Sequence, residues 1–140
     1  ASAKRKKGDL KGAIEDYTQA VKLKKDDYML YNNLGSARYD NGEYEEAISL
    51  FNMAISANAE YAFAYNNRAG AKFKLKDYKG AIDDYNKAIV LNDKYGYAYL
   101  NRGMAKEMMK DFTGACKDWE MAGMLGIASG KAYLDEYKNK

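Results

Sequence analysis

The side chains that could do chemistry in this sequence are amides, carboxylates and one thiol, because the sequence contains no histidine. The chain therefore lacks the usual general base, the commonest metal ligand and every histidine-containing catalytic triad. Its single cysteine, Cys116, excludes an intramolecular disulfide. Cys116 falls on an apolar face, level with Ile48 and Ile82, so we expect a packed small hydrophobic residue rather than a nucleophile.

The carboxylates and glycines form no pattern that is typical of an active site. Asp83 and Asp84 are adjacent in a segment with helical periodicity. This segment is the second helix of a repeat unit described below, and the residues expected to bind a ligand lie on the first helices. We therefore expect such carboxylates to be solvated. No glycine-rich phosphate loop and no metal-ligand spacing occurs. We therefore expect no catalytic residue, no metal site and no cofactor, and we predict that the protein is not an enzyme.

Asparagines, in contrast, recur at a fixed interval, since Asn33, Asn67 and Asn101 are 34 residues apart. An amide both donates and accepts hydrogen bonds, so a row of amides could hold the backbone of an extended peptide that has lost its water partners. The same row could equally form hydrogen bonds within the protein. The sequence alone leaves both interpretations open.

The 34-residue interval extends over most of the chain. The segment Tyr31-Asn32-Asn33-Leu34-Gly35 aligns with Tyr65-Asn66-Asn67-Arg68-Ala69 and Tyr99-Leu100-Asn101-Arg102-Gly103. The same register continues through Ala37, Ala71 and Ala105; Tyr44, Tyr78 and Phe112; Ala47, Ala81 and Ala115; Phe51, Tyr85 and Trp119; and Ala54, Ala88 and Ala122. Such self-similarity is the signature of a repeat protein.

Each unit predicts two helices. In the unit from Ala62, apolar residues spaced i, i+3, i+4 and i+7 predict helices over 62–75 and 78–91, with a break at Lys76 and Asp77. Over the whole chain we expect seven helices and a short N-terminal stub, Ala1 to Lys7, with no strand. Gly35, Ala69 and Gly103 are small enough to let the two helices of a unit approach closely.

This pattern resembles the tetratricopeptide repeat, a 34-residue helix–turn–helix with aromatic, glycine and alanine marks at fixed places. The resemblance covers nearly the whole chain and implies an all-α fold, an α-solenoid of helical hairpins wound into a right-handed superhelix. We expect a single domain over residues 1–140, divided into a partial repeat at 1–27, repeats at 28–61, 62–95 and 96–129, and a capping helix at 130–140.

The turn between the helices departs from the family pattern. The family's turn glycine is kept as Gly8 and Gly42 but is replaced by Lys76 and Lys110. If these lysines adopt a left-handed conformation, each costs on the order of 1 kcal/mol.

A coupled substitution predicts a contact inside each hairpin. Arg68 and Arg102 occupy equivalent places in the first helices of their units, and Asp84 and Asp118 occupy equivalent places in the second helices. In the unit from Tyr28 the same two places hold Leu34 and Leu50. Because the charged pair and the apolar pair alternate together, we expect the two places to touch.

In tetratricopeptide proteins the first helices line the concave surface, so the resemblance implies a groove made by their residues that are not used for packing. The expected groove residues are Met29, Asn32, Asn33, Ser36, Tyr39, Phe63, Asn66, Asn67, Phe73, Tyr97, Leu100, Asn101, Met104 and Met108, with Asp40, Gly70, Lys74 and Glu107 beside them. Amides together with aromatic and methionine side chains suit peptide capture. Some of the large apolar side chains could instead pack beneath loops or the cap.

One subfamily binds chaperone tails by clamping a C-terminal carboxylate with lysines, an arginine and asparagines on successive first helices. Here Asn67 could fill the central place, but Asn32 and Ser36 stand where lysine and asparagine are needed. Tyr97 and Asn101 stand where lysine and arginine are needed. We therefore expect no carboxylate clamp.

The sequence favours a non-catalytic protein–protein interaction scaffold that binds a peptide or protein segment in its groove. The ligand's identity is not specified. The first alternative is a self-associating module of a larger array, in which apolar faces around Ile14 and Tyr17 pair as a homodimer through the N-terminal end. The second is nucleic-acid binding through Lys4-Arg5-Lys6-Lys7, which is less favoured because the net charge is only +3. No signal peptide or membrane-spanning run is visible, so the compartment stays open with the cytoplasm favoured.

Overall fold

The computed structural model describes the backbone of residues 3–139 and the side chains of residues 9–139. Within that part of the chain every regular element is an α-helix, and no strand occurs. The helices are α1 (Ala3–Leu23), α2 (Tyr28–Asp40), α3 (Tyr44–Ala57), α4 (Ala62–Lys74), α5 (Tyr78–Leu91), α6 (Gly96–Met108), α7 (Phe112–Met124) and α8 (Ala128–Lys138). The predicted all-α fold is confirmed. The predicted count of seven helices and a stub is wrong, because residues 3–139 form eight helices and none of them is a separate stub.

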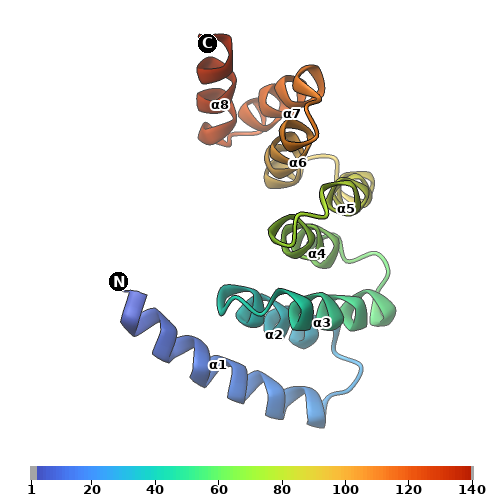
Figure 1. Cartoon of the computed structure of the whole chain (residues 1–140). Helices are drawn as coiled ribbons and strands as arrows, with labels where there is room; N and C mark the ends of the chain where they lie inside the picture. The colour runs from blue at the N-terminus through green and yellow to red at the C-terminus, as the bar shows by residue number, and fades with distance from the viewer. Residues whose placement is uncertain (1–2, 140) are drawn as a thin grey trace.

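The helices stack as sequential hairpins, with α1 and α8 at opposite ends of the stack (Figure 1). Helix α2 pairs with α3, α4 with α5 and α6 with α7, while α3 packs on α4 and α5 on α6. The first helices of successive hairpins also touch, α2 with α4 and α4 with α6. One face of the stack is therefore a continuous row of first helices. None of the described helices is long and apolar enough to cross a membrane.

Small residues hold the two helices of a hairpin close together, as predicted. A Cβ atom added to Gly35 would lie 2.5 Å from Cε1 of Phe51, which is fully buried. A Cβ atom added to Gly103 would lie 2.7 Å from Nε1 of Trp119. In the middle hairpin Ala69 faces the same way and is itself fully buried, in the cluster that holds Tyr85.

The lysines that replace the turn glycine adopt the left-handed conformation. Gly42 has φ 81°, and the two lysines at equivalent places, Lys76 and Lys110, have φ 66° and 65°. In each lysine turn the backbone closes tightly, with the amide of Lys76 donating to the carbonyl of Phe73 at 2.9 Å. The chain therefore keeps the turn where it has lost the glycine that makes the turn inexpensive.

The N-terminal region differs from the prediction of a stub, a turn at Gly8 and a separate helix. Helix α1 instead runs unbroken from Ala3 to Leu23, through Gly8. A helix of about two turns is marginal by itself, and a glycine inside a helix costs only about 1 kcal/mol, so continuing the helix satisfies more backbone groups than a turn would.

Helix α8 covers the end of the last hairpin and begins at Ala128, two residues before the predicted boundary. Gly126 adopts φ 91°, and the amide of Ile127 donates to the carbonyl of Ala122 at 2.9 Å, which ends α7 and turns the chain. Gly130 then lets α8 approach α7, since a Cβ there would lie 2.5 Å from the carbonyl oxygen of Trp119. Tyr133, Leu134 and Tyr137 pack on the core of the last hairpin.

Candidate functional site

Three adjoining cavities follow the row of first helices. The first, of about 330 Å³, is lined by Ser36, Tyr39, Asp40, Phe51, Asn66, Asn67, Gly70 and Asn101. The second, of about 150 Å³, is lined by Tyr39, Gly70, Phe73, Lys74, Tyr85, Asn101 and Met104. The third, of about 300 Å³, is lined by Met104, Glu107, Trp119, Tyr133, Glu136 and Tyr137. Neighbouring cavities share lining residues, so together they form one groove from α2 to α8.

The structure divides the sequence-predicted groove residues into three groups. Those that line the cavities are Ser36, Tyr39, Asn66, Asn67, Phe73, Asn101 and Met104. Those that are exposed but line none of the three cavities are Met29, Asn33, Phe63, Tyr97 and Met108. Asn32 and Leu100 are buried, so they support the groove from below.

The three repeated asparagines lie in three different environments. Asn67 donates through Nδ2 to Oδ1 of Asn32 at 3.0 Å and to Oγ of Ser36 at 3.4 Å, which links the second hairpin to the first. Asn33 is exposed. Asn101 lies between the first and second cavities and has no hydrogen-bond partner among the described residues. Of the three, Asn101 is the one whose amide is free to bond a ligand in the groove.

Two aromatic walls of the groove are held in place by neighbouring rings. Tyr39 packs edge-to-face on Tyr44 with ring centroids 5.3 Å apart, and Phe73 packs on Tyr78 in the same way at 5.2 Å. Burial, with smaller contributions from Tyr44 and Asp40, raises the pKa of Tyr39 above its ordinary value. The hydroxyl of Tyr39 is therefore neutral at physiological pH and can both donate and accept a hydrogen bond.

Two buried polar atoms lack a hydrogen-bond partner in the described part of the chain, and both belong to residues that line the groove. They are Oδ1 of Asn66 and Nε1 of Trp119. Native proteins leave few such atoms unpaired, and both of these atoms are buried beneath the lining of the groove. Burial raises the pKa of Tyr95 to about 12, and the neighbouring amide of Asn66 partly offsets that rise.

The predicted contacts between arginine and aspartate are confirmed, whereas the expectation that Asp84 is solvated is wrong, because Asp84 is buried by these contacts. Arg68 forms two parallel hydrogen bonds with Asp84, at 2.8 and 2.7 Å, and Arg102 binds Asp118 with the same geometry and distances. These bonds raise the pKa of the Arg68 guanidinium further. They lie within the hairpins and fix the first helices that carry the groove residues.

Each of these pairs belongs to a larger network that the sequence analysis missed. Arg68 also donates to Oδ1 of Asn52 on the preceding hairpin at 2.8 Å, and Lys72 lies 3.0 Å from Oδ2 of Asp84. The last hairpin repeats both contacts with Asn86 and Lys106. The 34-residue spacing of these side chains was a usable signal for them.

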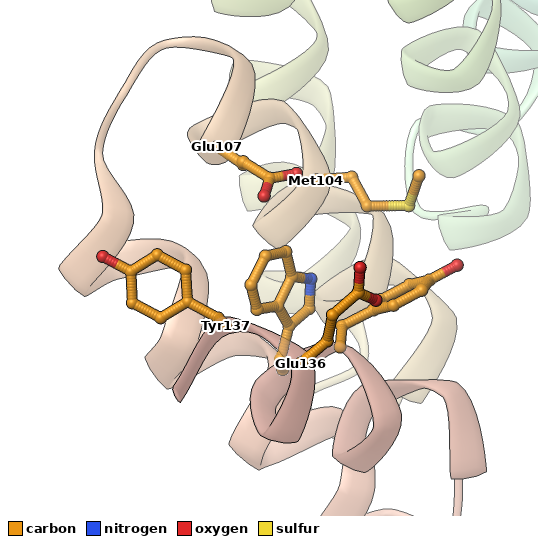
Figure 2. A pocket seen from close by; sticks show the side chains of 6 residues that line it. Met104, Glu107, Glu136 and Tyr137 are labelled. Carbon is orange, nitrogen blue, oxygen red and sulfur yellow. The ribbon is translucent and has the colours of Figure 1, made fainter. Parts of the chain in front are cut away.

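Helix α8 contributes groove residues that the sequence analysis assigned only to a cap. Tyr133 and Glu136 lie five and eight residues after the first residue of α8, as Asn101 and Met104 do in α6. They were missed because α8 starts 32 residues after α6 rather than 34, which shifts the register. Figure 2 shows Glu136 and Tyr137 facing Met104 and Glu107 across the third cavity.

The basic cluster, a metal site and Cys116 add nothing to the groove. The side chains of Lys4, Arg5, Lys6 and Lys7 lie outside the described part of the chain. Among the described residues no group of acidic, cysteine or histidine side chains could hold a metal ion. Cys116 is half-buried against the core of the last hairpin.

Comparison with known families and structures agrees with this architecture. Residues 1–42 match a family described as TPR repeat, and residues 30–61 and 62–95 match families described as tetratricopeptide repeat. The chain belongs to the tetratricopeptide repeat family. No curated protein matches the chain.

Solved structures of other tetratricopeptide repeat proteins have the same fold. MamA is 27% identical, with a TM-score of 0.79 over 95% of this chain and 85% of MamA. The first TPR of Spaghetti (RPAP3), solved with the HSP90 peptide SRMEEVD, is 28% identical, with a TM-score of 0.77 over 80% of this chain and 90% of that domain. The second TPR domain of human RPAP3, solved with the HSP70 peptide SGPTIEEVD, is 29% identical, with a TM-score of 0.73 over 79% and 93%.

Proposed function

We propose that this tetratricopeptide repeat protein is a non-catalytic scaffold that binds an extended segment of another protein in the groove from α2 to α8. The observation that carries the proposal is the continuity of the groove. Its first and second cavities share Tyr39, Gly70 and Asn101, and its second and third cavities share Met104. A continuous row of cavities suits an extended chain, which can place successive side chains in successive hollows.

The chemistry of the lining supports a peptide rather than a compact small molecule. Asn101 and the hydroxyl of Tyr39 can bond a peptide backbone, while Phe73 and Met104 offer apolar surface for its side chains. Two relatives of similar fold are complexes with short peptides. When a peptide binds in this groove, its backbone groups lose their water partners. Hydrogen bonds to Asn101 and Tyr39 would replace those partners.

The charges of this groove differ from what an acidic tail needs. The peptides of the two RPAP3 domains end in Glu-Glu-Val-Asp. In this chain the residues that line the three cavities include Lys74 as the one cation, against Asp40, Glu107 and Glu136. We therefore propose that SRMEEVD and SGPTIEEVD bind this groove poorly and that its ligands are neutral or basic.

The proposal is tested by selecting binders from a random-sequence peptide display library and measuring the selected peptides by titration calorimetry. Phe73→Ala, near the middle of the groove, should weaken binding by about 1–2 kcal/mol, since binding energy concentrates at central apolar contacts. Asp83→Ala is the matched control, because Asp83 is exposed on the second helix α5 and lines none of the three cavities. If Asp83→Ala weakens binding and Phe73→Ala does not, the binding surface is the opposite face.

A second candidate function is self-association through α1. Every other helix has at least one buried residue, whereas α1 has none among its described side chains. Ile14 and Tyr17 are half-buried, and Leu23 is 86% exposed. Sedimentation velocity over a hundredfold range of concentration tests this candidate. A monomer at every concentration excludes it, and a dimer that Ile14→Asp disrupts supports it.

A further inference from the structure

We infer that the end of the groove formed by α6, α7 and α8 receives an arginine side chain of the bound segment. The inference rests on the proposed function, since it names the chemistry that one part of the same groove selects. The cavity concerned is the third one, of about 300 Å³, lined by Met104, Glu107, Trp119, Tyr133, Glu136 and Tyr137.

The charges of this cavity are all negative. Glu107 comes from α6 and Glu136 from α8, and Figure 2 shows them on opposite sides of the cavity. Neither carboxylate has an ion pair or hydrogen bond with any described residue, whereas Asp84 and Asp118 are each held by an arginine and a lysine. Lys106, the one lysine of α6, is already bound to Asp118. Two unpaired carboxylates that face one hollow attract a cation.

The rest of the lining is suited to a flat cation. Trp119, Tyr133 and Tyr137 are aromatic, and Met104 adds a polarisable thioether. An arginine guanidinium stacks on aromatic rings and binds carboxylates in a planar, bidentate manner, whereas a lysine ammonium is a compact and more strongly hydrated charge. The lining therefore favours arginine over lysine.

The aromatic rings are fixed before any ligand arrives. Tyr133 packs edge-to-face on Trp119 with centroids 5.7 Å apart, and Tyr137 stacks on Phe112 at 5.7 Å with an interplanar angle of 19°. Trp119 is only 3% exposed, so its ring is held in the core while one part of it borders the cavity. Rigid rings lose little entropy on binding, which favours recognition of one side chain at this place.

The position of the third cavity also determines which end of the bound segment is recognised by its charge. Asp40 lines the first cavity and Lys74 lines the second, and their charges cancel. These two cavities therefore favour neither a positive nor a negative net charge on the ligand. The third cavity adds two negative charges at the α8 end. A bound segment is therefore selected by one basic residue at that end and by neutral residues elsewhere.

Trp119 is the only tryptophan of the chain, so its fluorescence reports on this cavity directly. The probe is N-acetyl-arginine amide, titrated into the whole chain, with N-acetyl-citrulline amide as a neutral probe of the same shape. We expect the arginine probe to change the fluorescence with an affinity about fivefold to tenfold higher than that of the citrulline probe. We expect the double variant Glu107→Gln with Glu136→Gln to remove that difference.

Glu120→Gln is the matched control variant, because Glu120 is exposed on α7 and does not line the third cavity. It should leave the preference for arginine unchanged. Equal affinity for the two probes, or a preference that survives in the double variant, overturns the inference. A circular dichroism spectrum of each variant verifies that the fold is intact.

A display selection separates this inference from the proposed function. Peptides selected on the wild-type chain should contain an arginine at one end, and peptides selected on the double variant should lose that preference. If groove peptides are selected without any enrichment of arginine, the inference fails and the proposed function stands. If the arginine probe binds as expected but no library peptide binds the groove, the cation site stands and the proposed function fails.

Discussion

The first hairpin, formed by α2 and α3, differs from the two later hairpins in the side chains between its two helices. The first hairpin has an apolar pair where each later hairpin has an ion pair. At the places where α4 and α5 carry Arg68 and Asp84, the first hairpin carries Leu34 and Leu50. Leu34 is buried, and Leu50 packs on the neighbouring core cluster. The same backbone arrangement therefore accepts either an apolar pair or an ion pair at the interface between the two helices.

The side chains around these two positions also differ between the first hairpin and the later ones. In the later hairpins Lys72 and Lys106 turn inward to the buried aspartates. The equivalent Arg38 of the first hairpin has no such aspartate and binds Glu43 across the turn at 3.0 Å. Asn52 and Asn86 bond the arginines of the following hairpin, whereas Thr18, at the equivalent place in α1, bonds its own helix at Ile14. These four places therefore change as a set.

The largest expected effect comes from breaking one network. Arg68→Leu leaves Asp84, which is 5% exposed, with Lys72 as its remaining partner. Removing one member of a buried ion pair leaves a charge without adequate compensation, so we expect the free energy of unfolding to fall by about 2–3 kcal/mol. Urea unfolding followed by circular dichroism measures the change.

The double variant Arg68→Leu with Asp84→Leu reproduces the chemistry of the first hairpin and should recover much of this loss. A well-packed apolar pair is often as stable as the buried ion pair that it replaces. A double variant that is no more stable than Arg68→Leu alone would show that the two hairpins are not interchangeable at these places.

A second comparison concerns the small residues, since Gly35 in the first hairpin is replaced by Ala69 in the second. Gly35→Ala should destabilise the protein by about 1–2 kcal/mol, because the new Cβ would overlap the buried ring of Phe51 and only part of that cost is offset by the helix propensity of alanine. Thermal unfolding measures the effect. Gly12→Ala in α1 is the control, since a Cβ there meets nothing within 4 Å and should stabilise slightly.

The repeated asparagines distinguish structural from binding roles. Asn67→Ala removes the donor that reaches buried Asn32, so we expect a loss of about 1 kcal/mol in the free energy of unfolding. Asn101→Ala removes no hydrogen bond within the described part, so it should leave stability within about 0.5 kcal/mol and weaken peptide binding instead. Equal stability losses in the two variants, measured in urea, would contradict this division.

The fold could be predicted from the sequence because its signal is repeated. The approximate helix bounds and the close approach at Gly35 follow from one 34-residue register that occurs three times. Where the register stops, the prediction failed. Helix α1 runs through Gly8, where a turn was predicted, because a separate helix of about two turns would be marginal. Helix α8 starts two residues early because the link through Gly126 is shorter than the other links between hairpins.

The groove was harder to predict, because helical spacing indicates which side a residue faces but not what it contacts. Spacing grouped Asn33, Asn67 and Asn101 together, although Asn67 alone bonds a neighbouring hairpin. It also grouped buried Leu100 with exposed Tyr97. The contribution of Glu136 required the position of α8, which no repeat unit specifies.

The smallest expected effect concerns the turns, where the first hairpin has Gly42 and the later two have Lys76 and Lys110. All three residues have positive φ, a conformation in which the Cβ of a lysine is strained and a glycine is not. Lys76→Gly should therefore stabilise the protein by about 0.5–1 kcal/mol, less than the full cost of the strain because glycine also increases the entropy of the unfolded chain. Gly42→Lys should destabilise it by a similar amount, and urea unfolding measures both. Lys76 is exposed and has no ion pair among the described residues, so no lost contact opposes the gain. If Lys76→Gly and Gly42→Lys shift stability in the same direction, turn strain does not distinguish the first hairpin from the others.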